Sequence, residues 1–134
     1  MTAAAAPHRL RSALLPYLAL SLALCASAIA VASHASDARV ALYGVGAAAA
    51  AAFVALPALA VGVPRGTNGV LAGFVAGFFA RMIAVAAGLV LSGSGAREGA
   101  ALTYTASFFG LYALTQAVEV AYVFGSSRAR RAGA

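Results

Sequence analysis

The stretch that decides the fold is Gly69 to Ser92, with the sequence GVLAGFVAGFFARMIAVAAGLVLS. It is apolar along its whole length except for one charged side chain, Arg81. A helix of about 20 apolar residues is long enough to cross the hydrocarbon core of a bilayer, which is roughly 30 Å thick. This stretch therefore predicts a transmembrane helix.

Three further stretches share this length and apolar character. The four expected spans are 14–33, 40–63, 69–92 and 100–125. Short polar connections separate them, so successive spans have to run antiparallel. The expected fold class is an all-α membrane protein with four transmembrane helices in two antiparallel hairpins. An N-terminal segment (1–13) precedes them and a basic tail (126–134) follows.

The composition excludes several classes of protein. The chain of 134 residues is 63% hydrophobic and only 9% charged, with a mean hydropathy of +0.94. This is too little charge for a soluble enzyme or a nucleic-acid binder. The single Cys25 excludes an intramolecular disulfide, and the two histidines lie outside the spans. We expect no catalytic, cofactor-binding or metal-ligating residues, and membrane lipids rather than nucleic acid as partners.

Arginine placement predicts the orientation, because arginines in short loops stay on the cytoplasmic side. With a cytoplasmic N-terminus, only Arg39 and Arg97 are outside. Six arginines are then inside: Arg9, Arg11, Arg65, Arg128, Arg130 and Arg131. We expect a multi-pass protein of the bacterial cytoplasmic (inner) membrane with both termini inside. The alternative is that the first span is a cleaved signal peptide, which would leave three spans.

A ladder of glycines runs through the third span. A glycine recurs every four positions before Arg81 and one more follows it: Gly69, Gly73, Gly77 and Gly88. Residues four apart lie on one face of a helix, and glycine leaves room for a second helix. We expect a packing surface that Arg81 continues. The alternative is a chance pattern in a span rich in Gly and Ala.

The fourth span carries a polar stripe that includes Thr115, Gln116 and Glu119, and Glu119 is the only acidic side chain within a span. Two interpretations are open for Glu119: a carboxylate that reaches water at the membrane surface, or a group that acts inside the bundle. Tyr104 and Tyr122, near the two ends of this span, suit an aromatic belt at the membrane interfaces.

Arg81 needs a partner, because an unpaired guanidinium deep in a bilayer costs at least about 2.5–3.5 kcal/mol. That partner is inside the chain or on another subunit. At 1.5 Å per residue, the Arg81 backbone lies about 18 Å from the cytoplasmic edge and that of Glu119 about 8 to 9 Å. Helical side chains lean toward the N-terminus, so in antiparallel spans both side chains close this offset. We predict that Arg81 contacts Glu119, Gln116 or both, with the glycines before Arg81 letting the two spans approach.

Two segments resemble a known family. Gly73 to Ile83 (GFVAGFFARMI) and Leu114 to Val120 (LTQAVEV) are similar to the ATP synthase protein I family, small four-span bacterial membrane proteins associated with the F-type ATP synthase. The resemblance covers the second half of the chain and the four-span plan. It implies a non-enzymatic accessory or assembly factor for the rotor ring of subunit c. It also implies, as an alternative, a role in magnesium supply.

The polar side chains of the spans help to choose between the assembly function and the magnesium function. Magnesium prefers several oxygen ligands, usually carboxylates with retained waters, and the spans hold only Glu119. A cation channel would need a homo-oligomer with a ring of Glu119 side chains, lined further by Thr115 and Gln116. We therefore expect docking to ATP synthase membrane subunits such as subunit c, with a small cation channel or transporter as the alternative.

Overall fold

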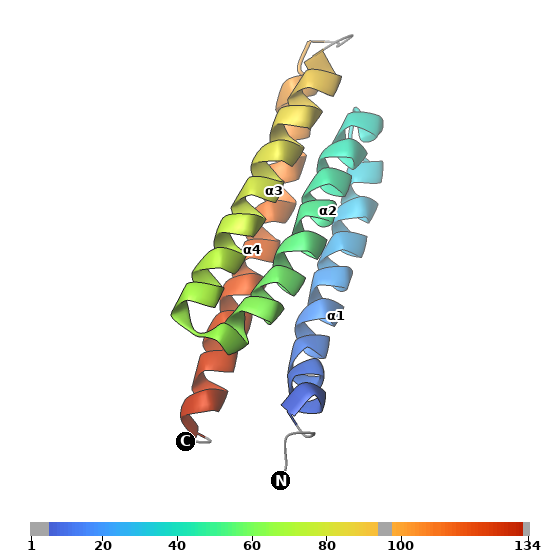
Figure 1. Ribbon diagram of the computed structural model, residues 1–134. Coiled ribbons are helices and arrows are strands. Elements are labelled where there is room, and N and C mark those ends of the chain that lie inside the picture. Colours follow the sequence, from blue (N-terminus) through green and yellow to red (C-terminus); the bar gives the residue numbers. More distant parts are fainter. Residues whose placement is uncertain (1–5, 94–97, 133–134) are drawn as a thin grey trace.

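The computed structural model describes residues 6–93 and 98–132, which form four long helices (Figure 1). These are α1 (Ala6–Ser33), α2 (Ala38–Gly62), α3 (Thr67–Gly93) and α4 (Ala100–Ala132), with a short 3-10 helix, η1 (Val63–Arg65), between α2 and α3. All four are long and apolar enough to cross a membrane. The described residues include no strand, so the predicted class of an all-α, four-helix membrane protein is confirmed.

Each helix continues past the apolar stretch that predicted it, at one end or both. α2 begins at Ala38, α3 begins at Thr67, and α4 runs to Ala132 through most of the expected basic tail. The reason is that hydropathy marks only the part of a helix that suits lipid, whereas backbone hydrogen bonds continue through polar residues. At 1.5 Å per residue α4 is about 50 Å long, which exceeds the bilayer core. Its last turns, which carry the exposed Arg128 and Arg131, therefore lie beyond that core.

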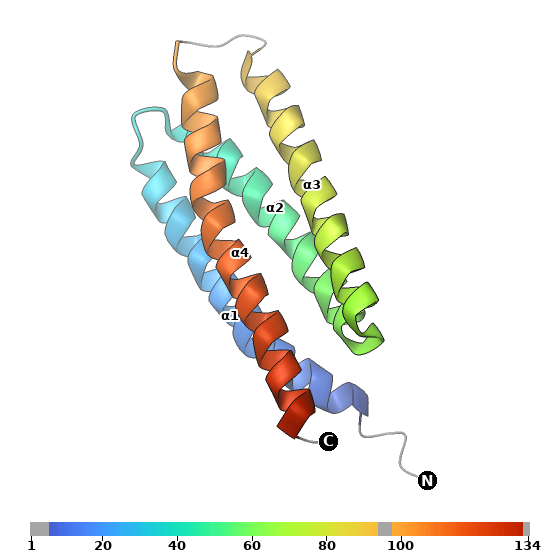
Figure 2. The ribbon, with the colours of Figure 1, turned by 90° about the vertical axis from the view of Figure 1, so that its left-hand side faces the viewer.

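α2 is the central helix of the bundle. It contacts the other three helices and lies between α1 and α3 in Figure 1, while α4 crosses in front of α2 in Figure 2. Most of its buried side chains are small, and small side chains allow the close helix contacts that stabilise membrane proteins. The buried residues of α2 are Ala41, Gly44, Val45, Ala48, Ala51, Ala52, Ala55, Leu56, Leu59 and Gly62.

The apolar core has two parts along the bundle. The first gathers buried residues of α1, α2 and α4: Cys25, Ala32, Ala41, Val45, Ala48, Tyr104, Phe108 and Leu111. The second, toward the other end, is made of Leu56, Leu59, Val63 and Tyr122. Tyr17 of α1 joins the second part through an edge-to-face contact with Tyr122, with ring centroids 5.3 Å apart.

The start of α1, the end of α4 and the connection between α2 and α3 lie at the same end of the bundle (Figure 1). That connection is short because Gly66 adopts a φ of 80°, a conformation that residues with a side chain rarely take. The turn between α1 and α2 lies at the opposite end (Figure 1). The described part of the chain therefore runs up and down as antiparallel neighbours, and Arg65 and Arg39 lie at opposite ends.

Candidate functional site

The candidate site is a buried ion pair between α3 and α4. Arg81 lies halfway along α3, and its Nη2 donates a hydrogen bond to Oε1 of Glu119 on α4. The two side chains are only 8% and 2% exposed. The predicted contact between Arg81 and the polar stripe of the fourth span is therefore confirmed for Glu119. The interpretation of Glu119 as a carboxylate in water at the membrane surface is wrong.

Two neighbours shape the space around the Arg81 guanidinium. Its Cζ lies 5.0 Å from the centroid of the Tyr112 ring, within the range of a cation–π contact. A Cβ added at Gly77 would lie 3.0 Å from Arg81 Nη1, so glycine at this position makes room for the guanidinium. Tyr112 lies on the polar stripe of the fourth span, but it was not among the side chains predicted to contact Arg81. The available signal was its position seven residues before Glu119, which is two turns along one helical face.

The pair forms a polar layer between the two apolar parts of the core. On α4, Thr115 and Glu119 lie between Leu111, which belongs to the first part, and Tyr122, which belongs to the second. Arg81 lies at the same level on α3. Because opposite charges on the described parts of α3 and α4 meet only at this level, the pair fixes the register of the two helices.

The second oxygen of Glu119 is not used within the described structure. Its Oε2 is buried and has no hydrogen-bond partner among the described residues. Thr115 is 1% exposed, but its hydroxyl lies 3.1 Å from the carbonyl oxygens of Leu111 and Tyr112 and bonds to its own helix. Gln116 is half-buried, and no hydrogen bond joins it to Arg81 in the part of the chain that the structure describes.

The glycine ladder packs mainly against α2, which corrects the expectation that it lets the third and fourth spans approach. A Cβ added at Gly73 would lie 3.0 Å from Cδ2 of Leu59, and one added at Gly77 would lie 2.9 Å from Cβ of Ala55. Gly69 lies against the backbone of Gly62. All three contacts are with α2.

The reason is that a spacing of four residues does not stay on one face of an α-helix. Four residues turn the helix by about 400°, so each step of the ladder rotates by about 40°. The ladder therefore winds around α3, from α2 at Gly69 to α4 at Arg81. Gly88 continues on the α4 side, where it lies against the ring of Tyr104.

Tyr104 and Tyr122 do not form an aromatic belt, because both are buried, with 2% and 1% of their surface exposed. The Tyr104 hydroxyl donates a 2.7 Å hydrogen bond to the carbonyl oxygen of Ala84 on α3. Tyr104 therefore reaches across the space left by Gly88. About five turns further along α4, Tyr122 packs on Tyr17 of α1. Both tyrosines are core residues that join α4 to its neighbours.

The chemistry open to this site is limited. The charges of Arg81 and Glu119 cancel, and the free Oε2 is able to accept one further hydrogen bond or a proton. Across the described ranges, no group of three or more His, Cys, Asp or Glu side chains is placed to hold a metal ion.

Comparisons of the chain with models of known families, with curated proteins and with solved structures gave no match.

Proposed function

We propose that this protein is a non-enzymatic accessory or assembly factor for the F-type ATP synthase of the bacterial cytoplasmic membrane, and that it aids assembly of the subunit c ring. The segments Gly73 to Ile83 and Leu114 to Val120, which resemble the ATP synthase protein I family, support the proposal. Arg81 belongs to the first segment and Glu119 to the second, so their ion pair joins the two segments in the fold.

The observation that carries the proposal is the outer face of α3. The α3 charge is paired inside the bundle, and 17% of the most apolar window of this helix is buried, compared with 11% for α1, 44% for α2 and 33% for α4. The exposed large side chains on it are Leu71, Val75, Phe78, Phe79, Met82, Ile83, Leu89, Val90 and Leu91. A wide apolar face without charge suits packing against the transmembrane helices of a partner.

The test is deletion of the gene, followed by measurement of the assembled subunit c ring on native gels. We expect the deletion to lower the yield or stability of the ring, and the wild-type gene to restore it. Phe79→Ala and Met82→Ala together should restore it less well, because they remove part of the exposed α3 face. A matched pair on α4, Leu102→Ala with Phe109→Ala, is the control. An unchanged ring yield in the deletion strain would contradict the proposal.

The second candidate function is a small cation (magnesium) channel or transporter. The buried Oε2 of Glu119 favours it, because an unpaired carboxylate oxygen in a membrane often belongs to an ion path. Against it, Glu119 and Thr115 face the interior of a single bundle, so a shared ring in an oligomer would require the bundle to open. A growth defect at low magnesium that is restored by the wild-type gene but not by Glu119→Gln, with normal ring assembly, would favour this function.

We also propose that both termini are cytoplasmic. The end of the bundle with the start of α1 and the end of α4 also carries Arg65, Arg128 and Arg131. Reporter fusions after Arg65 and Arg131 should therefore read cytoplasmic, and fusions after His34 and Arg97 should read periplasmic. Arg97 lies outside the described residues, so His34 is the structurally defined control. A cytoplasmic signal at His34, or a mature protein without the first span, would contradict this topology.

A further inference from the structure

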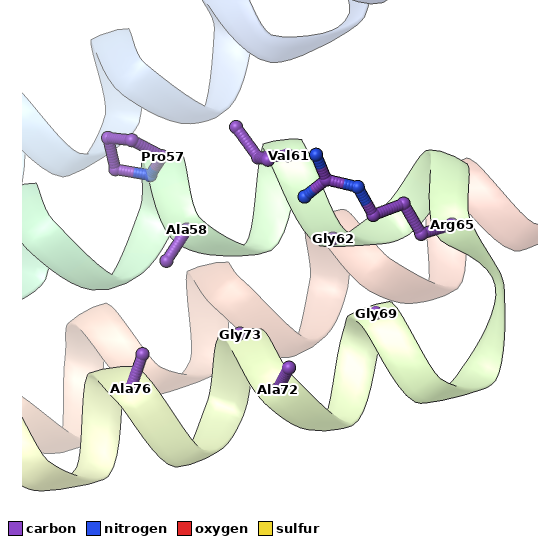
Figure 3. Close-up of a pocket in the computed structure, with 9 residues that line it drawn as sticks. All are labelled: Pro57, Ala58, Val61, Gly62, Arg65, Gly69, Ala72, Gly73 and Ala76. Carbon is purple, nitrogen blue, oxygen red and sulfur yellow. The ribbon is translucent and has the colours of Figure 1, made fainter.

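A groove runs along the outside of the bundle between α2 and α3 (Figure 3). Its volume is about 430 Å³, and it is lined by glycines and alanines together with Pro57, Val61 and Arg65. Six of the lining residues define its course: Ala58, Gly62, Arg65, Gly69, Gly73 and Ala76. The groove is shallow because the backbones of the two helices meet at its floor, at Gly62 and Gly69, and it is apolar because mostly small apolar residues line it.

The groove covers only one leaflet of a membrane. From Gly69 to Ala76 it extends over about 10 Å at 1.5 Å per residue, whereas half of the bilayer core is about 15 Å. One turn further toward the centre of the membrane, the small residues give way to bulky ones. These are Phe53 and Val54 on α2, and Phe79 on α3. All three are exposed and bulky. An acyl chain that enters from one leaflet fits such a groove, whereas a transmembrane helix would cross both leaflets.

The outer end of the groove is positively charged. The Arg65 side chain is exposed and runs back beside Val61 over the groove (Figure 3). The next residue, Gly66, accepts the first backbone hydrogen bond of α3, from Val70 N–H, and has no side chain to cap the helix. The positive end of the α3 dipole therefore lies next to the guanidinium. Both features favour an anionic group at this position.

No described acid competes for Arg65. Glu119 is paired with Arg81, and Asp37 and Glu98 lie at the opposite end of the bundle. The cations Arg128 and Arg131 share the end on which Arg65 lies. The charge at the mouth of the groove therefore has no partner within the described residues, and a lipid phosphate at the membrane surface is complementary to it.

We propose that this groove binds an anionic phospholipid, with an acyl chain along Gly69, Gly73 and Ala76 and the headgroup phosphate on Arg65. The lipid belongs to the leaflet on the side where α1 begins and α4 ends. It would fill the space that the α2–α3 hairpin leaves open.

The test uses the purified full-length protein in a non-ionic detergent, titrated with phosphatidylglycerol or with phosphatidylcholine of the same acyl chains. Native mass spectrometry counts the bound lipids. We expect phosphatidylglycerol to bind the wild type about tenfold more tightly than phosphatidylcholine, which corresponds to about 1.4 kcal/mol. Arg65→Gln should remove this preference, and Ala72→Leu, which fills the groove, should weaken the binding of both lipids.

Two matched controls separate the groove from general effects. Arg128→Gln removes an exposed arginine at the same end of the bundle and should leave the preference largely unchanged. Ala86→Leu is the same change as Ala72→Leu and lies on nearly the same face of α3, but 14 residues further on and outside the groove. It should leave lipid binding unchanged.

Three results would overturn the proposal. Equal binding of the two lipids by the wild type would remove the role of the headgroup. An equal effect of Arg65→Gln and Arg128→Gln would indicate general surface charge. Unchanged lipid binding in Ala72→Leu would show that no acyl chain occupies the groove, and loss of subunit c co-purification in that variant would identify a partner helix as the occupant. The lipid-binding measurements use no ATP synthase, so they do not depend on the proposed function; only the co-purification result does.

Discussion

Replacing Arg81 with leucine should lower the melting temperature of the detergent-solubilised protein by roughly 10 °C. The substitution leaves the Glu119 carboxylate buried without its only hydrogen-bond donor among the described residues. Removing one partner of a buried ion pair typically costs about 3 kcal/mol or more, because the remaining charge has lost both water and its counter-ion. The cost is expected to be high here because the Glu119 side chain is 2% exposed.

The double variant Arg81→Leu with Glu119→Leu should recover part of this loss. With both charges removed, no unpaired group remains in the core, and two apolar side chains fill the layer between the two apolar parts. The recovery will be incomplete, because the contact of the guanidinium with Tyr112 and the fit against Gly77 are also lost.

Thermal unfolding of these variants can be followed through Cys25. Cys25 is the only cysteine and is buried, so a thiol-reactive fluorophore labels it only as the bundle opens on heating. Arg39→Leu, which removes an exposed arginine, is the control and should melt like the wild type. A double variant as unstable as Arg81→Leu alone, or a single variant as stable as the control, would show that the pair does not stabilise the fold.

The helices and their directions were predictable from the sequence because the membrane imposes a length and a polarity on each span. The ends were not predictable in the same way. α4 continues to Ala132, beyond the predicted span. Hydropathy did not predict this end, because it reports how well a segment suits lipid and not where its backbone hydrogen bonds stop. The depth of each residue followed from the spans, and this was enough to predict the contact between Arg81 and Glu119.

The neighbours of each helical face were not predictable, because they depend on how four helices pack around one another. The glycine ladder meets α2 first and α4 only from Arg81 onward, since each step of four residues rotates the face. Tyr104 is buried for a related reason: Gly88, on another helix, provides the space for its ring. The residue pattern of one helix does not predict which other helix packs against each of its faces. The role of Gly77 beside the guanidinium depends on the same packing.

The second large effect is expected at the contact between Gly62 and Gly69. A Cβ at Gly69 would lie 2.7 Å from Cβ of Arg65 and would overlap the carbonyl group of Gly62. A backbone carbonyl in a helix cannot rotate away as a flexible side chain does. Gly69→Ala should therefore push α3 away from α2 near the Gly66 turn, at a cost of about 2 kcal/mol.

Gly46→Ala is the matched control, because it is the same substitution on an exposed face of α2, where no described residue beyond the adjacent backbone of α2 and the two neighbours in the chain lies within 4 Å of the added Cβ. Alanine has the higher helix propensity, by about 1 kcal/mol, so this variant should melt at or slightly above the wild-type temperature.

Gly73→Ala should be intermediate, since its added Cβ would meet the flexible Leu59 side chain at 3.0 Å as well as the backbone of α2. From the highest to the lowest melting temperature, the expected order is thus Gly46→Ala, Gly73→Ala and Gly69→Ala. The labelling of Cys25 on heating measures it. If Gly69→Ala melted as high as Gly46→Ala, the backbones of α2 and α3 would not be in contact at Gly62, and the inner wall of the groove would have a different shape.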